Sequence, residues 1–232
     1  HAGGRRAGGA GFRCAVIMPF PDSMTFSLAL VMAYLLGSLS GSLLLGRLIG
    51  VDIRQSGSGN AGGTNALRTR GWKFALGVVL IDVGKGVIAA LVPAWLGVEG
   101  ERLATAQVVC VLAAVIGHVW PIFFGFRGGK GAATLIGGLL VIWPLAVPCV
   151  IAVWALVLVC TGYVGLSTIL ACAALVPLTW LLPGGATPLR IAFATTAALL
   201  ILYTHRANLK RLRDGSESRF ERVRLFARRR PG

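Results

Sequence analysis

The stretch GAATLIGGLLVIWPLAVPCVIAVWALVLVC, residues 131–160, contains no charged side chain, and the charge-free run that it begins continues to residue 189. About 20 apolar residues are enough to carry a helix across a lipid bilayer. A charge-free run of this length must therefore fold back at least once, and Pro144, Pro148, Pro177 and Pro183 provide places to turn. We expect two short helices within 131–161 that turn near Trp143, followed by a further span over 167–182.

The whole chain has the composition of a membrane protein. Its 232 residues are 56% hydrophobic and only 13% charged, with a mean hydropathy of +0.77. A soluble domain of this length needs more polar surface than that. The sequence therefore predicts an all-α, polytopic integral membrane protein with about seven transmembrane helices, or about five with re-entrant pieces as the alternative. The remaining expected spans cover residues 25–49, 72–96, 103–124 and 190–204.

Positive charge is concentrated at one face of these spans. The formal net charge is +15, and basic residues gather in the loops 51–73 and 125–131 and in the tail 205–232. Because short cytoplasmic loops are rich in Lys and Arg, we place these three segments in the cytoplasm, with the N-terminus outside and the C-terminus inside. The basic residues do not form an amphipathic soluble domain, so we expect contact with anionic lipid headgroups and no nucleic-acid partner.

The chain is expected to contain one folded domain. We assign residues 24–212 to a single transmembrane domain, residues 1–23 to a disordered N-terminal tail and residues 213–232 to a basic cytoplasmic tail. The arginines of the N-terminal tail conflict with an external N-terminus, so this tail is expected to be dispensable. The five cysteines show no CxxC or His-paired spacing, so we expect no disulfide and no metal site.

The first polar segment is SGSGNAGGTNALRTRG, residues 56–71. Its glycines allow backbone conformations in which successive N–H groups point to one place, which makes a concavity for an anion. The spacing of a Walker A loop is absent. A flexible connector is the alternative, but a connector has no need of two asparagines and a threonine among its glycines. The expected anion ligands are Ser58, Gly59, Asn60, Thr64, Asn65 and Arg68, with Arg68 as a bidentate partner for phosphate.

The second polar segment is GHVWPIFFGFRGGKGAAT, residues 117–134. Two cations flank the glycine pair Gly128–Gly129, and a helix is expected to begin directly after Lys130. An anion at this point would meet both cations, backbone N–H groups and the positive end of a helix. His118 is interpreted either as a packed, hydrogen-bonded residue or as a general base.

Two further polar segments follow, TGYVGLST at 161–168 and YTHRANLKRLRDGSESRF at 203–220. His205 and Asn208 are three residues apart, so they share one face of a helix that leaves the last span. Arg206, Lys210 and Arg211 are expected to anchor that helix at the membrane interface. Asp82 and Lys85, also three apart, are interpreted as a structural ion pair within the second span.

These segments resemble the bacterial acyl-phosphate glycerol-3-phosphate acyltransferases of the PlsY type. GSGNAGGTNALR is similar to the first motif of that family, GH..PIFFGFRGGKGAAT to the second and GYVGLST to the third, and the resemblance extends over about residues 24 to 220. Gly63 replaces the usual alanine of the first motif. Gly165 lies where the third motif usually has serine, which leaves the hydroxyl of Ser167 or Thr168 to serve there.

The resemblance implies transfer of a fatty acyl group from acyl phosphate to the 1-hydroxyl of glycerol 3-phosphate, giving lysophosphatidic acid and phosphate at the start of phospholipid synthesis. Acyl phosphate is already an activated mixed anhydride, so neither a cofactor nor a protein nucleophile is required. The expected catalytic residues are Ser58, Lys130 and His118. The expected substrate-binding residues are Ser58, Gly59, Asn60, Thr64, Asn65, Arg68, Gly128, Gly129, Lys130, Ser167, His205 and Asn208.

Several points stay open at this stage. The general base is His118, His205 or a substrate phosphate. The expected location is the bacterial cytoplasmic (inner) membrane, with the active site facing the cytoplasm. We expect a monomer, with a dimer as the alternative. A membrane transporter of a phosphate ester is the alternative function, although such a protein would place polar residues through the membrane depth.

Overall fold

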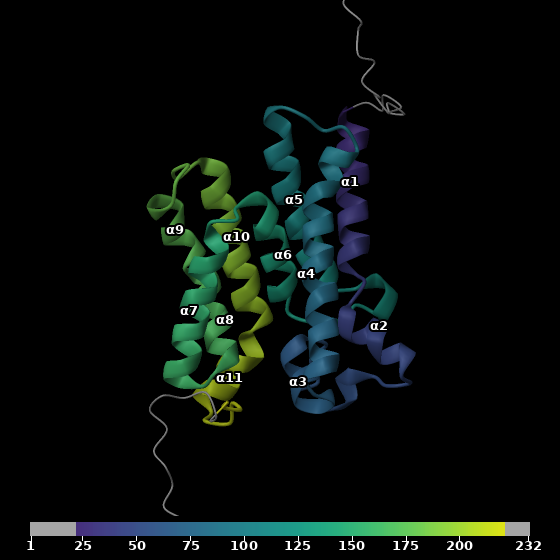
Figure 1. The fold of residues 1–232 in the computed structure, drawn as a ribbon, viewed down its shortest axis with the longest axis vertical. Helices are drawn as coiled ribbons and strands as arrows, with labels where there is room; N and C mark the ends of the chain where they lie inside the picture. The colour runs from purple at the N-terminus through teal and green to yellow at the C-terminus, as the bar shows by residue number, and fades with distance from the viewer. Residues whose placement is uncertain (1–21, 221–232) are drawn as a thin grey trace, which may run out of the picture.

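The computed structural model describes residues 22–220, and every regular element in this range is a helix, as predicted (Figure 1). The helices are α1 (Asp22–Gly37), α2 (Gly41–Leu48), η1 (Ile53–Gln55), α3 (Gly63–Arg70), α4 (Trp72–Trp95), α5 (Glu101–Val119), η2 (Ile122–Phe124), α6 (Ala132–Ile142), α7 (Ala146–Thr161), α8 (Val164–Ala173), α9 (Leu175–Leu181), α10 (Pro188–Thr204) and α11 (Arg206–Arg213). All but the last two residues of the predicted N-terminal tail lie outside the described range; those two begin α1.

The predicted span over 25–49 is broken in two. Its parts, α1 and α2, meet at an angle of 50° across residues 38–40. The free backbone groups of the break find partners on α4: the Gly41 amide donates to Asp82 Oδ1, and the Gly37 and Leu39 carbonyls accept from Lys85 Nζ. The break is therefore set by residues more than 40 positions later in the chain.

The other predicted helices appear close to their expected positions. Three helices in the described range are long and apolar enough to cross a membrane, and the bent α1–α2 pair makes a fourth if it is one span. Three shorter apolar helices, α6, α7 and α10, accompany them. The count of seven spans and the orientation of the two ends stay predictions.

Small residues allow the central helices to approach closely. A Cβ on Gly86 of α4 would lie 2.1 Å from the carbonyl oxygen of Thr134 on α6, and one on Gly137 would lie 2.0 Å from the Val83 carbonyl oxygen. A Cβ on Gly37 would lie 2.1 Å from the Ala114 carbonyl oxygen, so the end of α1 packs closely against α5. Contacts of this kind are typical of helix association in membranes.

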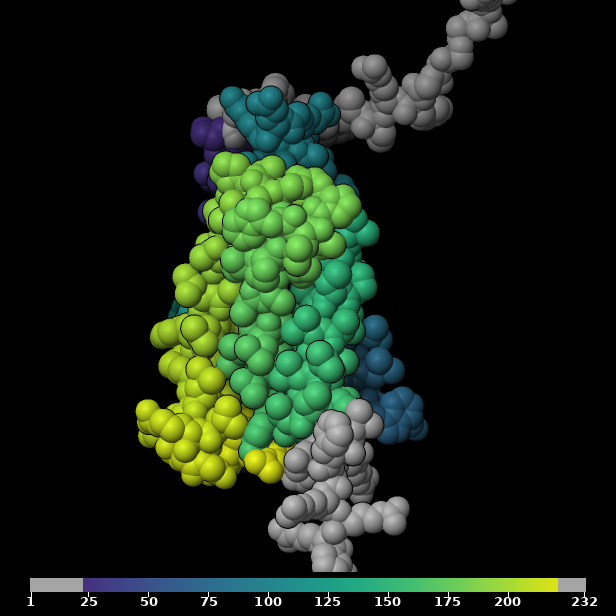
Figure 2. All heavy atoms as spheres, turned by 90° about the vertical axis from the view of Figure 1, so that its left-hand side faces the viewer, coloured from purple at the N-terminus to yellow at the C-terminus, as the bar shows by residue number. Residues whose placement is uncertain are grey.

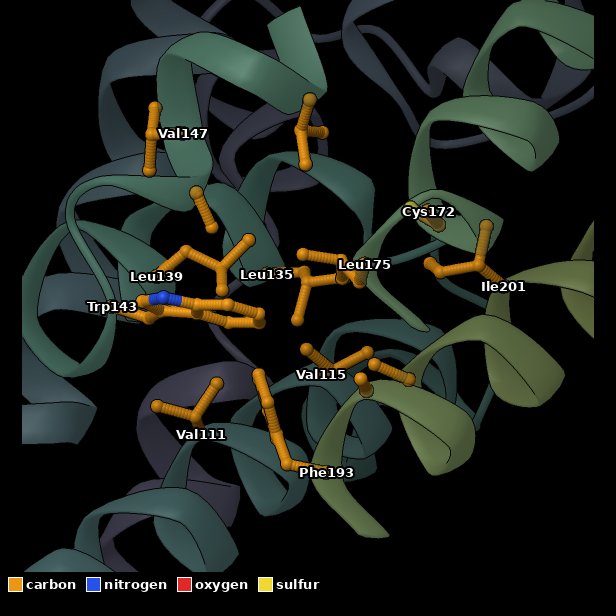
Figure 3. Packing of buried hydrophobic residues seen from close by; sticks show 14 of the residues in the cluster. Val111, Val115, Leu135, Leu139, Trp143, Val147, Cys172, Leu175, Phe193 and Ile201 are labelled. Carbon is orange, nitrogen blue, oxygen red and sulfur yellow. The ribbon is translucent and has the colours of Figure 1, made fainter. Parts of the chain in front are cut away.

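The largest apolar core lies between α5, α6, α7, α8 and α10, where Trp143, Leu139 and Phe193 pack together (Figure 3). This core joins helices from both halves of the chain, and residues of the second half cover most of the face seen in Figure 2. Figure 1 shows α3 and α11 at one end of the bundle, opposite α9 and the α4–α5 connection. The first and fourth polar segments thus reach the same end, as the charge pattern predicted.

Candidate active site

The polar segments surround one cavity of about 1020 Å³ between α3, α4, α6, α8 and α11. The structure brings most of the predicted site residues to its wall, but not Gly59, Gly128, Gly129 or Ser167. The predicted residues that line the cavity are Ser58, Asn60, Thr64, Asn65, Arg68, His118, Lys130, His205 and Asn208.

Asn65 organises the first polar segment. Its side-chain oxygen accepts a hydrogen bond from the Ser58 amide at 2.9 Å, and its nitrogen donates to the carbonyls of Ile53 and Ser56, each at 3.0 Å. Gly57 has a positive φ of 60°, and a Cβ there would lie 2.3 Å from Asn65 Oδ1. The Asn65 amide is therefore occupied in shaping the loop rather than free to bind phosphate.

The glycine pair of the second segment has a different role from the one predicted. The Gly128 amide donates to the Val119 carbonyl and the Gly129 amide to the His118 carbonyl, both at 3.1 Å. A Cβ on Gly128 would lie 2.0 Å from the His118 carbonyl oxygen, and one on Gly129 would lie 2.1 Å from His118 Nε2. These amides complete the end of α5 and do not face the cavity, so the glycines serve close packing instead.

Backbone N–H groups reach the cavity from two helix starts. Gly131, Ala132 and Ala133 line the cavity at the beginning of α6, and Gly62 and Gly63 line it at the beginning of α3. The first N–H groups of a helix have no partner within the helix, and they carry its positive end. The start of the helix after Lys130 thus lies at the cavity, as the predicted anion site requires, and the residues that line it there follow the glycine pair by two to four positions.

The fourth segment supplies more of the site than the sequence indicated. Lys130 Nζ donates to Asn208 Oδ1, and Asn208 Nδ2 donates to Glu217 Oε1 at 2.6 Å. Arg211 Nε donates to the other oxygen of Glu217 at 2.6 Å. Arg211, which was expected to anchor α11 at the interface, lines the cavity because it lies three residues after Asn208 on the same helical face.

Glu217 and Ser218 also line the cavity, although both belong to the segment assigned to a separate tail. Phe220 lies near them: its amide donates to the Gly162 carbonyl at 2.9 Å, and its ring centre is 4.7 Å from the Arg68 guanidinium. The presence of an acidic residue in a strongly basic segment was the available signal for Glu217. The boundary between domain and tail stays a prediction.

Of the two hydroxyls that the sequence left open in the third segment, Thr168 lines the cavity, whereas Ser167, the one named among the expected binding residues, does not. Ser167 is fully buried and donates to the Tyr163 carbonyl at 2.8 Å, away from the cavity. Thr168 lines the cavity, where it accepts from Trp154 Nε1 at 3.2 Å. Gly165 lines it too, and a Cβ at this position would lie 2.8 Å from Asn208 Nδ2.

Burial changes the ionisation of two groups at the site. Burial of the ammonium group, reinforced by the charges of Arg211 and Arg68, lowers the pKa of Lys130 to about 8. Burial and the charge of Lys130 lower the pKa of His205 to about 4, so this imidazole is neutral at pH 7. Its Nδ1 lies 2.8 Å from the Ile201 carbonyl oxygen, which can only accept; Nδ1 therefore carries the hydrogen, and Nε2 is left as an acceptor.

The lowered pKa of Lys130 predicts a pH dependence. If the charged ammonium binds phosphate, kcat/KM for a phosphorylated acceptor should be highest below about pH 8 and fall as the pH rises through about 8, where the free site loses its proton. The second ionisation of a phosphate ester lies near pH 6, so the substrate does not produce this decline. The residual activity of Lys130→Arg should show no such decline, because guanidinium stays protonated. A flat wild-type profile up to about pH 9.5 would contradict the prediction.

Asp82, Lys85 and His118 form a buried group at the inner wall. Lys85 Nζ lies 3.0 Å from Asp82 Oδ1, so the ion pair expected from the sequence is present. His118 Nδ1 lies 2.8 Å from Lys85 Nζ and 3.4 Å from Asp82 Oδ1, a contact that the sequence did not reveal. Both Asp82 and His118 line the cavity.

Comparison with known proteins identifies the family. A family model described as Glycerol-3-phosphate acyltransferase matches residues 27–215. The glycerol-3-phosphate acyltransferases of Chlorobaculum parvum and Pseudomonas paraeruginosa are 39% and 44% identical to this chain, over 84% and 82% of it and 97% of each relative.

Solved structures agree. Crystal structures of PlsY (YgiH), an integral membrane glycerol 3-phosphate acyltransferase, in its glycerol 3-phosphate form and its lysophosphatidic acid form, match with TM-scores of 0.77 and 0.74. Both are 34% identical to this chain and cover 84% of it, and this chain covers 96% and 95% of theirs. The resemblance of the sequence motifs is thereby confirmed, and this chain belongs to the glycerol-3-phosphate acyltransferase family of integral membrane proteins.

Proposed function

We propose that the protein transfers a fatty acyl group from acyl phosphate to the 1-hydroxyl of glycerol 3-phosphate, which gives lysophosphatidic acid and inorganic phosphate. The observation that carries this proposal is the gathering of Arg68, Lys130 and Arg211 around one cavity with the N-terminus of α6. Both substrates are phosphorylated, and such a cluster neutralises their charges. No cofactor takes part in this reaction.

The apolar part of the cavity suits the acyl chain. Trp72, Leu76 and Val79 follow one another along the exposed face of α4 and line the cavity. Trp154 and Val164 line it from α7 and α8. A chain lying between these helices would bring its activated carbonyl to the polar end, where the cations and the α6 amides are.

The reaction then needs one displacement. The 1-hydroxyl oxygen of glycerol 3-phosphate attacks the acyl carbonyl carbon, the bond from that carbon to the phosphate oxygen breaks, and phosphate departs. The N–H groups at the start of α6 and the Ser58 hydroxyl stabilise the carbonyl oxyanion, and Lys130 stabilises the departing phosphate. No acyl-enzyme is formed, because the donor is already activated.

The hydroxyl proton is taken by an oxygen of the departing phosphate. His205 has a pKa of about 4, so it is a weak base, but its Nε2 can accept a hydrogen bond that orients the hydroxyl. His118 has its Nδ1 occupied by Lys85 and Asp82, and its Nε2 lies against Gly129. We therefore assign His205 to orientation of the acceptor and His118 to the support of the second segment.

We further propose a bacterial inner-membrane protein of seven spans whose active site faces the cytoplasm. The four apolar candidates among the long helices and the bent pair, together with α6, α7 and α10, make up that number. The basic helices α3 and α11 share one end of the bundle, and the positive-inside rule assigns that end to the cytoplasm. We propose a monomer, because every group of the proposed site belongs to one chain.

A transfer assay with two donors tests the proposal. Purified protein in detergent with glycerol 3-phosphate should form lysophosphatidic acid from palmitoyl phosphate and not from palmitoyl-CoA. Thioester-using glycerol-phosphate acyltransferases rely on a His-x-x-x-x-Asp pair, whereas Phe123 and Lys210 stand five residues after His118 and His205. A Lys130→Ala preparation controls for contaminating acyltransferases. Comparable turnover with palmitoyl-CoA would refute the donor assignment, and no turnover with either donor would refute the proposed function.

A further inference from the structure

We infer that the buried Asp82–Lys85 pair is a positioning device of the active site, which acts through His118 to hold the second polar segment in place. This inference rests on the proposed function, because it assigns the pair a role in binding the phosphorylated acceptor. The three side chains are only 1%, 4% and 3% exposed. They form a continuous group between the break in the first span and the loop 128–130 of the second polar segment.

One side of this group holds the break between α1 and α2. Lys85 Nζ donates to the Gly37 carbonyl at 2.8 Å and to the Leu39 carbonyl at 3.1 Å, and Asp82 Oδ1 accepts from the Gly41 amide at 3.0 Å. The Gly37 carbonyl at the end of α1, the Leu39 carbonyl in the break and the first amide of α2 are thus hydrogen-bonded to the ion pair. This accounts for three hydrogen bonds, but a neutral pair of polar side chains could provide the same.

The other side of the group reaches the loop 128–130 of the second polar segment. His118 Nδ1 contacts both members of the pair, at 2.8 Å from Lys85 Nζ and 3.4 Å from Asp82 Oδ1. The opposite edge of the ring lies against Gly129, so closely that a Cβ there would be 2.1 Å from Nε2. The His118 carbonyl accepts the Gly129 amide, and Lys130 follows directly. The orientation of this ring therefore sets where the loop, and the lysine after it, can lie.

The first polar segment meets the ring at the same point. The position that a Gly129 Cβ would occupy is also 2.8 Å from the carbonyl oxygen of Ala61, a buried residue of that segment. His118 is thus packed where the two anion-binding segments adjoin. A buried ion pair seldom adds net stability over a neutral pair of similar size, so stability alone does not require charges here. The role that remains is positional: His118 Nδ1 accepts from the Lys85 ammonium at 2.8 Å, and Asp82 holds that ammonium at 3.0 Å, so the pair fixes the ring.

The test compares a neutral pair with the charged pair. In Asp82→Asn/Lys85→Gln neither charge is left without its partner, and the hydrogen-bonding groups are partly retained. We expect this variant to be extracted as a folded protein, with KM for glycerol 3-phosphate raised at least ~10-fold and kcat changed less than ~3-fold. Thr179→Val removes a buried hydroxyl on α9, at the opposite end of the bundle, and is the matched control with unchanged KM.

A double-mutant cycle shows whether the pair acts through His118. His118→Ala should raise the same KM at least ~10-fold, and adding the neutral pair to it should raise KM less than ~3-fold further. Effects that multiply, or a wild-type KM in either variant, would overturn the inference while leaving the proposed function intact. If the neutral pair does not fold, His118→Ala alone decides, because a wild-type KM there would still overturn it. Absence of transfer by the wild type would refute the proposed function instead.

Discussion

Replacing Lys130 with alanine is expected to lower acyl transfer at least ~100-fold, which corresponds to about 2.7 kcal/mol of transition-state stabilisation. The ammonium group lies in a partly buried site beside Asn208, with Arg211 and Glu217 close by. Charge-assisted hydrogen bonds to phosphate are stronger in such surroundings than in water, and the departing phosphate gains charge as the reaction proceeds. The loss should therefore appear mainly in kcat.

Two further variants make the Lys130 result specific. Arg68→Ala should cause a loss of similar size, because this guanidinium also lines the cavity. Lys210→Ala removes an exposed lysine that does not line the cavity, and it should retain wild-type transfer. All three proteins should elute as folded species in detergent. Near-normal rates for both Lys130→Ala and Arg68→Ala would remove the proposed phosphate site.

Hydropathy was sufficient to find the helices whose ends are set by local signals. The predicted span 72–96 agrees with α4 at Trp72–Trp95, and the turn expected near Trp143 separates α6 from α7. The break between α1 and α2 could not be predicted in this way, because residues 38–40 are Ser, Leu and Ser and include neither a proline nor a charged residue. Their free backbone groups are satisfied by Asp82 and Lys85, and only the tertiary structure brings those residues near.

The candidate site, too, could be predicted only in part: the sequence indicated the types of residue that form it, but not the direction in which each of them faces. The sequence indicated which segments gather and which cations they contribute. It could not tell that Gly128 and Gly129 direct their amides to α5, since that depends on the carbonyls left free at the end of that helix. Nor could it distinguish Ser167 from Thr168: adjacent positions on a helix point about 100° apart, and the packing of α8 decides which faces the cavity.

A second large effect on acyl transfer is expected from substitution of Gly129, because this residue packs directly against His118. Gly129→Ala is expected to lower kcat/KM for glycerol 3-phosphate at least ~100-fold. The added Cβ would lie 2.1 Å from His118 Nε2 and 2.8 Å from the Ala61 carbonyl oxygen. The ring is buried and its Nδ1 is held by Lys85, which opposes displacement of the ring into the adjoining cavity. The loop must therefore move away from α5 and carry Lys130 with it.

A glycine in a different setting provides the control. Gly84 lies inside α4, and a Cβ there meets no atom within 4 Å. Gly84→Ala should keep wild-type transfer and favour the helix slightly, because alanine has the higher helix propensity. If Gly129→Ala were equally active, the loop could reach its working position without the close contact on His118. The contact would then not set the working position of the loop, and the second segment would bind phosphate from a different loop position.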